Sequence, residues 1–155
     1  MKKIKIIVID DKQEELERAK AAVEAAGHEA IAFSDFSYRG DVPSVWKQMA
    51  EADGVITDLF FDPRCNTNND VREAYKANPP AMGLVVALHA FHLGKPVVIC
   101  TSGYHHGPEL SFVYDAYCSA TEFDIGFGWE EGKDWAKAVK MLETGVKNPW
   151  ALDRE

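Results

Sequence analysis

Runs of apolar residues alternate with amphipathic segments along the first half of the chain. Residues 4–9 are almost continuously apolar and β-branched, which is typical of a strand covered on both faces. Apolar positions then recur at helical spacing up to Gly27, and a glycine at that point suits the end of a helix. The same reasoning predicts strands at 28–33 and 54–61 and a helix at about 43–51.

The second half repeats this alternation after a polar break. Residues 62–80 carry Asn-rich turn signals and a double proline, and they predict an insertion or long loop with a short helix near 70–76. Beyond the break we expect a helix at 81–93, a strand at 96–102, a helix at 108–120, a strand at 122–128 and a helix at 133–144. Strands that alternate with helices predict an α/β fold, a doubly wound five-stranded parallel sheet flanked by helices, with an insertion after the third strand.

Acidic residues stand where two of the predicted strands end. Asp10 and Asp11 follow the first strand, and Asp58 lies at the end of the apolar core of the third. The carboxyl ends of parallel strands meet at one edge of the sheet, so we expect these side chains to lie together, with Thr101 on the same edge. Clustered carboxylates are costly to bury without a cation, and hard oxygen ligands suit Mg²⁺. The sequence therefore predicts a magnesium site formed by the three acids.

Length and charge narrow the classes of function. The 155 residues fit one domain, which we place at 1–147 with a C-terminal tail at 148–155. A formal net charge of -8 disfavours binding to nucleic acid or to anionic membranes, since both need basic patches. No stretch is long enough to span a membrane and no cleavage signal follows the first strand, so we expect a cytoplasmic protein.

With these residues placed, the chain resembles the receiver domain of two-component response regulators, the CheY-like fold. IIVIDD resembles the family's first strand with its acidic pair, DGVITDLFF the third strand, and GKPVVICTSG the fourth. The resemblance implies that Asp58 is the phosphoacceptor, that Asp10, Asp11 and Asp58 hold Mg²⁺, and that Thr101 is the hydroxyl that binds the phosphoryl group. Such a domain is a substrate and a partial catalyst of its own phosphorylation, not a turnover enzyme.

The resemblance also implies partners. A histidine kinase or a phosphotransfer protein would supply the phosphoryl group, and a downstream protein target would read the result. Because the chain ends soon after the last predicted helix, we expect a stand-alone receiver whose output passes through protein–protein contacts.

The chain departs from the family pattern in its lysine. The family has a lysine before a proline at the end of the fifth strand, whereas EFDIGFGW offers Phe127 or Gly128 there. Lys133 could reach in from the start of the last helix, but we prefer the interpretation that it is a solvated helix-terminal lysine. A fixed ammonium would pair with the phosphoryl oxygens, so its absence predicts a weakened, rewired or abolished switch.

Two further departures lie beside the proposed site. The insertion at 62–80 begins close to Asp58 and is either a lid or partner surface, or a tolerated surface loop. His105 and His106 follow Thr101 closely, and we interpret them as exposed loop histidines in preference to a phosphate donor or a metal ligand.

Two other functions compete with the phosphoacceptor. One is a pseudo-receiver, a protein-interaction module that acts without phosphorylation, which the missing lysine favours and the retained acids disfavour. The other is a small Mg²⁺-dependent phosphatase-like enzyme, which ranks last because the sequence has no P-loop and no DxD pair of nucleophile and acid.

Overall fold

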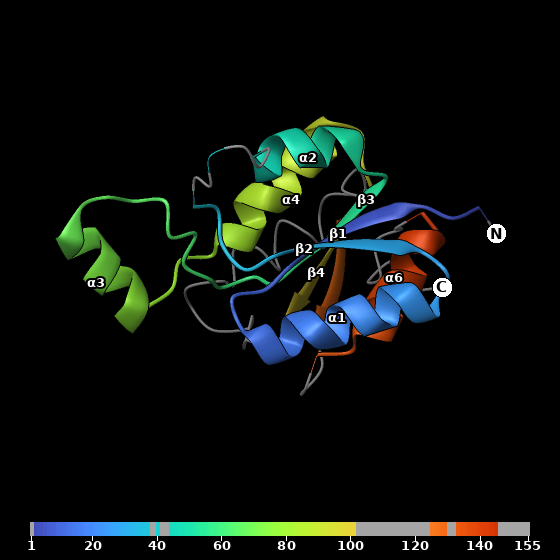
Figure 1. Ribbon diagram of the computed structural model, residues 1–155, viewed down its shortest axis with the longest axis horizontal. Coiled ribbons are helices and arrows are strands. Elements are labelled where there is room, and N and C mark those ends of the chain that lie inside the picture. Colours follow the sequence, from blue (N-terminus) through green and yellow to red (C-terminus); the bar gives the residue numbers. More distant parts are fainter. Residues whose placement is uncertain (1, 38–39, 41–43, 102–124, 130–132, 146–155) are drawn as a thin grey trace, which may run out of the picture.

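The computed structural model describes residues 2–37, 40, 44–101, 125–129 and 133–145, of which 125–129 are described as backbone. A five-stranded parallel sheet, in the order β2-β1-β3-β4-β5, has helices on both faces (Figure 1). The elements are β1 (Lys5–Ile9), α1 (Gln13–Ala25), β2 (Glu29–Phe33), α2 (Val45–Glu51), β3 (Gly54–Thr57), α3 (Asn69–Ala77), α4 (Met82–His92), β4 (Val97–Thr101), β5 (Ile125–Trp129) and α6 (Trp135–Glu143). The predicted fold class is confirmed, and the helix predicted at 108–120 lies outside the described residues.

The central strand β1 shows why the sheet needs cover on both sides. Its last four residues are fully buried. Ile7 and Ile9 pack in a core with α2 and α4, whereas Ile6 and Val8 pack in a second core with α1 and α6. Successive strand residues point to opposite faces, so a continuous apolar run is stable only between two helical layers.

Helices α1 and α6 cover the same face of the sheet (Figure 1). The residues that the pattern of α6 places inward are all buried, namely Trp135, Ala138, Val139 and Leu142. Helix α1 ends at Ala25, and Gly27, two residues beyond, adopts φ +86°, a conformation that favours glycine. Within the part of the chain that the structure describes, no helix is long and apolar enough to cross a lipid bilayer.

The strand order places its switch point between the carboxyl ends of β1 and β3. Strand β1 pairs with β2 on one side and with β3 on the other, and all of these pairings are parallel. Chain crossovers leave this point in opposite directions, which is where ligands bind in open α/β sheets. Strand β3 ends at Thr57 and not at residue 61 as predicted, because Leu59 and Phe61 pack into the core with α4 and do not extend the ladder.

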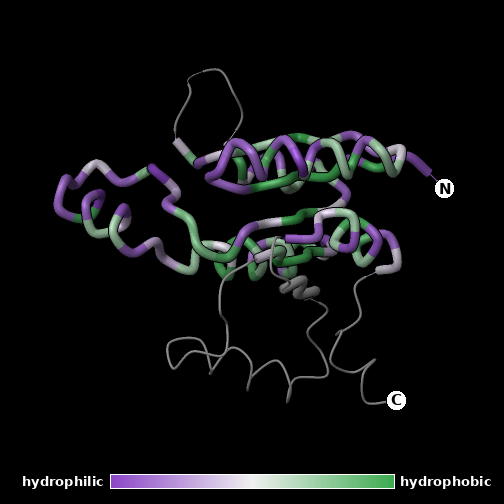
Figure 2. Tube along the Cα trace, turned by 90° about the horizontal axis from the view of Figure 1, so that it is seen from below, coloured by the Kyte–Doolittle hydropathy of each residue, from purple (hydrophilic) through white to green (hydrophobic). Residues whose placement is uncertain are grey.

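The polar segment 62–80 forms an arm that carries α3. Its two ends are joined where the N–H of Phe61 donates to the carbonyl of Pro80 at 3.2 Å. Helix α3 begins at a side-chain cap from Asn68, contains no buried residue and stands away from both helical layers (Figures 1 and 2). The predicted short helix in this segment is confirmed, and the arm leaves the body next to the end of β3.

Candidate functional site

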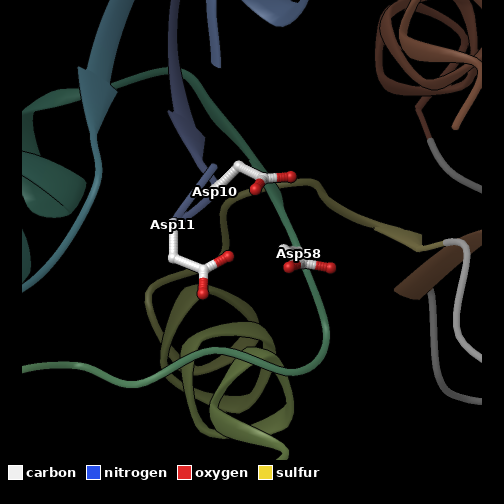
Figure 3. A group of neighbouring side chains, drawn as sticks. All are labelled: Asp10, Asp11 and Asp58. Carbon is white, nitrogen blue, oxygen red and sulfur yellow. The ribbon is translucent and has the colours of Figure 1, made fainter. Parts of the chain in front are cut away.

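Three carboxylates meet at the carboxyl edge of the sheet (Figure 3). Asp10 and Asp11 follow β1, and Asp58 directly follows β3. One oxygen of each carboxylate lies within 4.8 Å of the others. Asp10 is fully buried, Asp58 is 6% exposed and Asp11 is half-buried. The structure therefore brings together the three acids that the strand pattern predicts.

Main-chain hydrogen bonds fix the two strand ends and their carboxylates. The N–H of Asp58 donates to the carbonyl of Ile9 at 2.8 Å, which ties the end of β3 to the end of β1. The N–H of Leu59 donates to Asp58 Oδ1 at 2.8 Å, and the N–H of Lys12 donates to Asp10 Oδ1 at 2.9 Å. The carboxylates of Asp10 and Asp58 are thus each oriented by the loop in which they lie, before any ligand binds.

Lys133 supplies the positive charge of this site. Its side chain is buried, and its Nζ donates to Asp10 Oδ2 and lies 3.2 Å from Asp58 Oδ1. The prediction of a solvated helix-terminal lysine is therefore wrong. Two buried carboxylates need a cation to offset their charge, and the Lys133 ammonium supplies it. Lys133 lies four positions beyond Trp129, the last residue of β5.

The carboxylates and the ammonium shift one another's protonation. The pKa of Asp58 is raised to about 6, because burial and, to a smaller extent, the charge of Asp10 raise it by more than the Lys133 ammonium lowers it. Burial and the charge of Asp10 also raise the pKa of Asp11. Burial alone would lower the pKa of Lys133, but the nearby carboxylates of Asp58 and Asp10 raise it above its ordinary value. At neutral pH the site therefore contains an ionised Asp58 beside a protonated lysine.

This donor set fits a divalent cation. Three carboxylates face one ammonium, so the site keeps an excess of negative charge at neutral pH. Carboxylate oxygens are hard ligands of the kind that Mg²⁺ prefers, and Mg²⁺ usually binds through one or two of them while it keeps several waters.

Thr101 and Cys100 end the neighbouring strand on the same edge. Thr57 pairs in register with Ile99, so Thr101 extends two residues past the last paired residue of β3. Thr101 is 1% exposed. Burial raises the pKa of Cys100 to about 12, so this group is a neutral thiol. The structure places the Thr101 hydroxyl at the sheet edge, and its role as a switch remains a prediction.

Helix α4 packs directly on the main chain that follows β3. The N–H of Gly83 donates to the carbonyl of Leu59 at 2.9 Å. A Cβ on Gly83 would overlap the main-chain carbonyl of Asp58 and lie 2.8 Å from the Cα of Leu59. Only a glycine lets the first turn of α4 approach the site so closely, so the position of this helix is coupled to the backbone of Asp58.

The other candidate residues lie apart from this cluster or outside the described residues. His105 and His106 belong to the second group, so the interpretation of both as exposed loop residues stays a prediction. The insertion begins four positions after Asp58, and the carbonyl of Pro63 accepts a hydrogen bond of 2.7 Å from the N–H of Phe36. This bond ties the base of the arm to the loop that follows β2.

Solved structures share this arrangement of strands and helices. The chain is similar to a response regulator receiver protein from Sinorhizobium medicae, with a TM-score of 0.54 and 17% identity over 94% of this chain and 95% of that one. The chain has the receiver-domain fold. A structure described as a transiently phosphorylated "switch" in bacterial signal transduction also shares this fold, with a TM-score of 0.53 and 18% identity over 100% of both chains.

A third example of the receiver fold comes from a Francisella response regulator, with a TM-score of 0.52 and 13% identity over 92% of this chain and 96% of that receiver domain. No family model and no curated protein matches the sequence. At these identities the similarity concerns the fold, and the expected CheY-like architecture is confirmed.

Lys133 is the site residue that sequence reasoning considered and set aside. The expectation of a lysine at the strand end directed attention to Phe127 and Gly128. One signal pointed the other way, because Trp135 is on the inward face of the last helix and lies only two positions after this lysine. A residue so close to an inward-facing helix start has a short path to the core.

Proposed function

We propose that the protein is an atypical receiver module in which Asp58 accepts a phosphoryl group in two-component phosphorelay signalling. The observation that carries this proposal is the buried group of Asp10, Asp58 and Lys133, with Asp11 beside it. Phosphoryl transfer depends mainly on positioning and on neutralising charge on the transferred oxygens. A buried nucleophile between other acids and a fixed ammonium meets both needs.

In the proposed reaction an Asp58 carboxylate oxygen attacks the phosphorus of a phosphohistidine or a small acyl phosphate. The bond from phosphorus to the donor breaks, and the donor leaves as imidazole or carboxylate. The N–H of Leu59 binds Asp58 Oδ1 and so fixes the orientation of the attacking carboxylate. Asp10, Asp11 and Asp58 would hold Mg²⁺, which when bound offsets negative charge on the phosphoryl oxygens. The protein then acts as substrate and partial catalyst.

Lys133 and Thr101 would act on the phosphorylated state. The Lys133 ammonium already lies 3.2 Å from Asp58 Oδ1, where it can pair with a new dianion on that side chain. The buried hydroxyl of Thr101, at the end of the adjacent strand pair, would donate to a phosphoryl oxygen. The new charge on Asp58 would then shift α4, because this helix packs through Gly83 on the main chain of Asp58 and Leu59. A histidine kinase or phosphotransfer protein would be the donor, and a downstream protein the reader.

Intact-mass spectrometry tests the proposal. Wild type, Asp58→Asn and Asp62→Asn are incubated with acetyl phosphate and Mg²⁺, with a parallel sample in EDTA. Asp62 is a matched control because it lies on the same loop and, among the residues that the structure describes, accepts a local bond from the N–H of Arg64 at 2.8 Å. We expect a phosphoryl adduct on wild type and on Asp62→Asn, and none on Asp58→Asn or in EDTA.

The absence of an adduct on wild type would refute the phosphoacceptor. Calorimetric titration of the same protein with Mg²⁺ then separates the two remaining accounts, the protein-interaction module and the Mg²⁺-dependent phosphatase-like enzyme. No Mg²⁺ binding would exclude the enzyme and leave a constitutive protein-interaction module, whereas Mg²⁺ binding without phosphorylation would keep the enzyme as a candidate.

A further inference from the structure

Lys133 occupies the site from an unusual position in the chain. It lies beyond the end of β5, in a left-handed backbone conformation with φ +42°, and is followed by Asp134, whose side chain caps α6. A non-glycine residue in this conformation persists only where the surrounding structure fixes it. The surrounding structure must therefore hold the backbone of Lys133 in addition to its ammonium.

Contacts from α1 reach the main chain of this lysine. Arg18 Nη2 donates to the carbonyl oxygen of Lys133 at 3.3 Å, across 115 positions of sequence. The same guanidinium is fixed within its own helix, because Arg18 Nη1 donates to Glu15 Oε1 at 2.7 Å. These two side chains are three positions apart and lie on the same face of α1.

The second oxygen of the Glu15 carboxylate binds Trp135, whose ring lies near the Lys133 ammonium. The indole Nε1–H of Trp135 donates to Glu15 Oε2 at 2.8 Å. Trp135 is 3% exposed, and its ring lies 5.8 Å from Lys133 Nζ, within the range of a cation–π contact. One carboxylate on α1 thus binds groups that contact Lys133 at its carbonyl and at its ammonium.

The charge of Glu15 supports this arrangement. Partial burial raises the pKa of this carboxyl group, but the bond from Trp135 and the charges of Arg18 and Lys133 outweigh burial and lower it. Glu15 is therefore ionised at neutral pH, and both of its oxygens are acceptors.

We propose that Glu15, Arg18 and Trp135 form a clamp on α1 and α6 that positions the Lys133 ammonium against Asp58. Lys133 lies four positions beyond the end of β5, so the strand does not fix it directly, and the clamp does so instead. Its effect on phosphorylation rests on the proposed function, whereas its hold on the lysine does not. Glu15 and Trp135 are positioning residues, because they act on Asp58 only through Lys133.

Chemical labelling of Lys133 tests the clamp without phosphorylation. Trace acetylation with acetic anhydride, read by peptide mass spectrometry, compares Lys133 with the exposed Lys47 in the same molecule. Trp135→Phe keeps an aromatic ring and removes the indole donor, and Glu15→Ala removes the acceptor. Glu14→Ala is the matched control, since this neighbouring acid is exposed and its removal changes the charge equally.

We expect Lys133 labelling relative to Lys47 to rise about 5- to 10-fold in Trp135→Phe and Glu15→Ala, as the loss of a charge-assisted hydrogen bond implies. The Glu14→Ala ratio should match wild type. Far-UV circular dichroism and the urea midpoint show whether each variant is folded under the labelling conditions. If Glu15→Ala does not fold, the more conservative Trp135→Phe decides the result. Unchanged labelling in a folded Trp135→Phe would overturn the clamp.

Phosphorylation of the same variants separates the two proposals. If wild type takes a phosphoryl group from acetyl phosphate, the rate should fall about tenfold in Trp135→Phe and remain unchanged in Glu14→Ala. A normal rate together with normal labelling in Trp135→Phe would refute the clamp and leave the phosphoacceptor standing. If wild type takes no phosphate, raised labelling in the variants would still support the clamp while the proposed function fails.

Discussion

Replacing Asp58 with Asn should stabilise the metal-free protein at neutral pH. Burial raises the pKa of this carboxyl group from its ordinary 3.8 to about 6 in the folded state. Between these two values the folded protein binds more protons than the unfolded chain, so the free energy of unfolding falls as pH rises. The loss of stability that the ionised Asp58 causes is absent below the pKa of the unfolded chain. It grows between the two pKa values and is complete above the pKa of the folded protein.

The size of the effect follows from the difference between the two pKa values. A shift of about 2 units corresponds to about 3 kcal/mol, at about 1.36 kcal/mol for each unit. Asp58 is only 6% exposed, so solvent screening takes away little of this cost. Asn keeps an oxygen that can accept from the N–H of Leu59, which donates to Asp58 Oδ1 at 2.8 Å, but it loses the charge that faces Lys133. We therefore expect a gain of about 1–3 kcal/mol.

Urea denaturation in EDTA from about pH 4 to about pH 8 measures the effect. The difference between Asp58→Asn and wild type should be near zero at the acidic end and should reach its full value above about pH 6.5. Asp62→Asn, on the same loop, is the control for the loss of one negative charge. The reasoning is refuted if Asp58→Asn is no more stable than wild type at about pH 7.5, or if the difference does not change with pH.

Three other substitutions follow from the close packing of two glycines and from the charges of the site. Gly83→Ala should cost about 2–3 kcal/mol, because its Cβ would lie 2.8 Å from the Cα of Leu59, a main-chain atom that cannot move aside, and urea denaturation measures the loss. Gly54→Ala should cost about 1 kcal/mol, because the close atom, 2.6 Å away, is the Cδ2 of Leu142, which can rotate. Lys133→Met should cost about 3 kcal/mol in EDTA, because it leaves two buried carboxylates without a cation, and added Mg²⁺ should restore part of the stability.

Controls for these substitutions come from the same elements. Val85→Ala changes an exposed residue of α4 and should leave the urea midpoint almost unchanged. An equal cost for Gly83→Ala and Gly54→Ala would contradict the distinction between main-chain and side-chain contacts. A Lys133→Met variant as stable as wild type in EDTA would show that the ammonium is not needed to bury the carboxylates.

The pattern of the sequence predicted the elements whose residues are constrained on both faces. The run at 4–9 could only be a strand between two helical layers, and the inward residues of α6 are buried as their spacing predicts. Strand β3 was predicted too long, because Leu59 and Phe61 remain apolar after the ladder ends. An apolar run predicts that its residues are buried. It does not predict whether they belong to a strand or to a loop that packs against a helix.

The sequence by itself determined the sheet, its class and the meeting of Asp10, Asp11 and Asp58, because parallel strands bring their carboxyl ends to one edge whatever the length of chain between them. Only the tertiary structure decided the role of Lys133. This residue reaches the acids from a left-handed turn beyond β5, and contacts from α1, far away in sequence, hold it there. No periodicity governs such a turn, so its side chain is directed by long-range packing and by the need of two buried carboxylates for a cation.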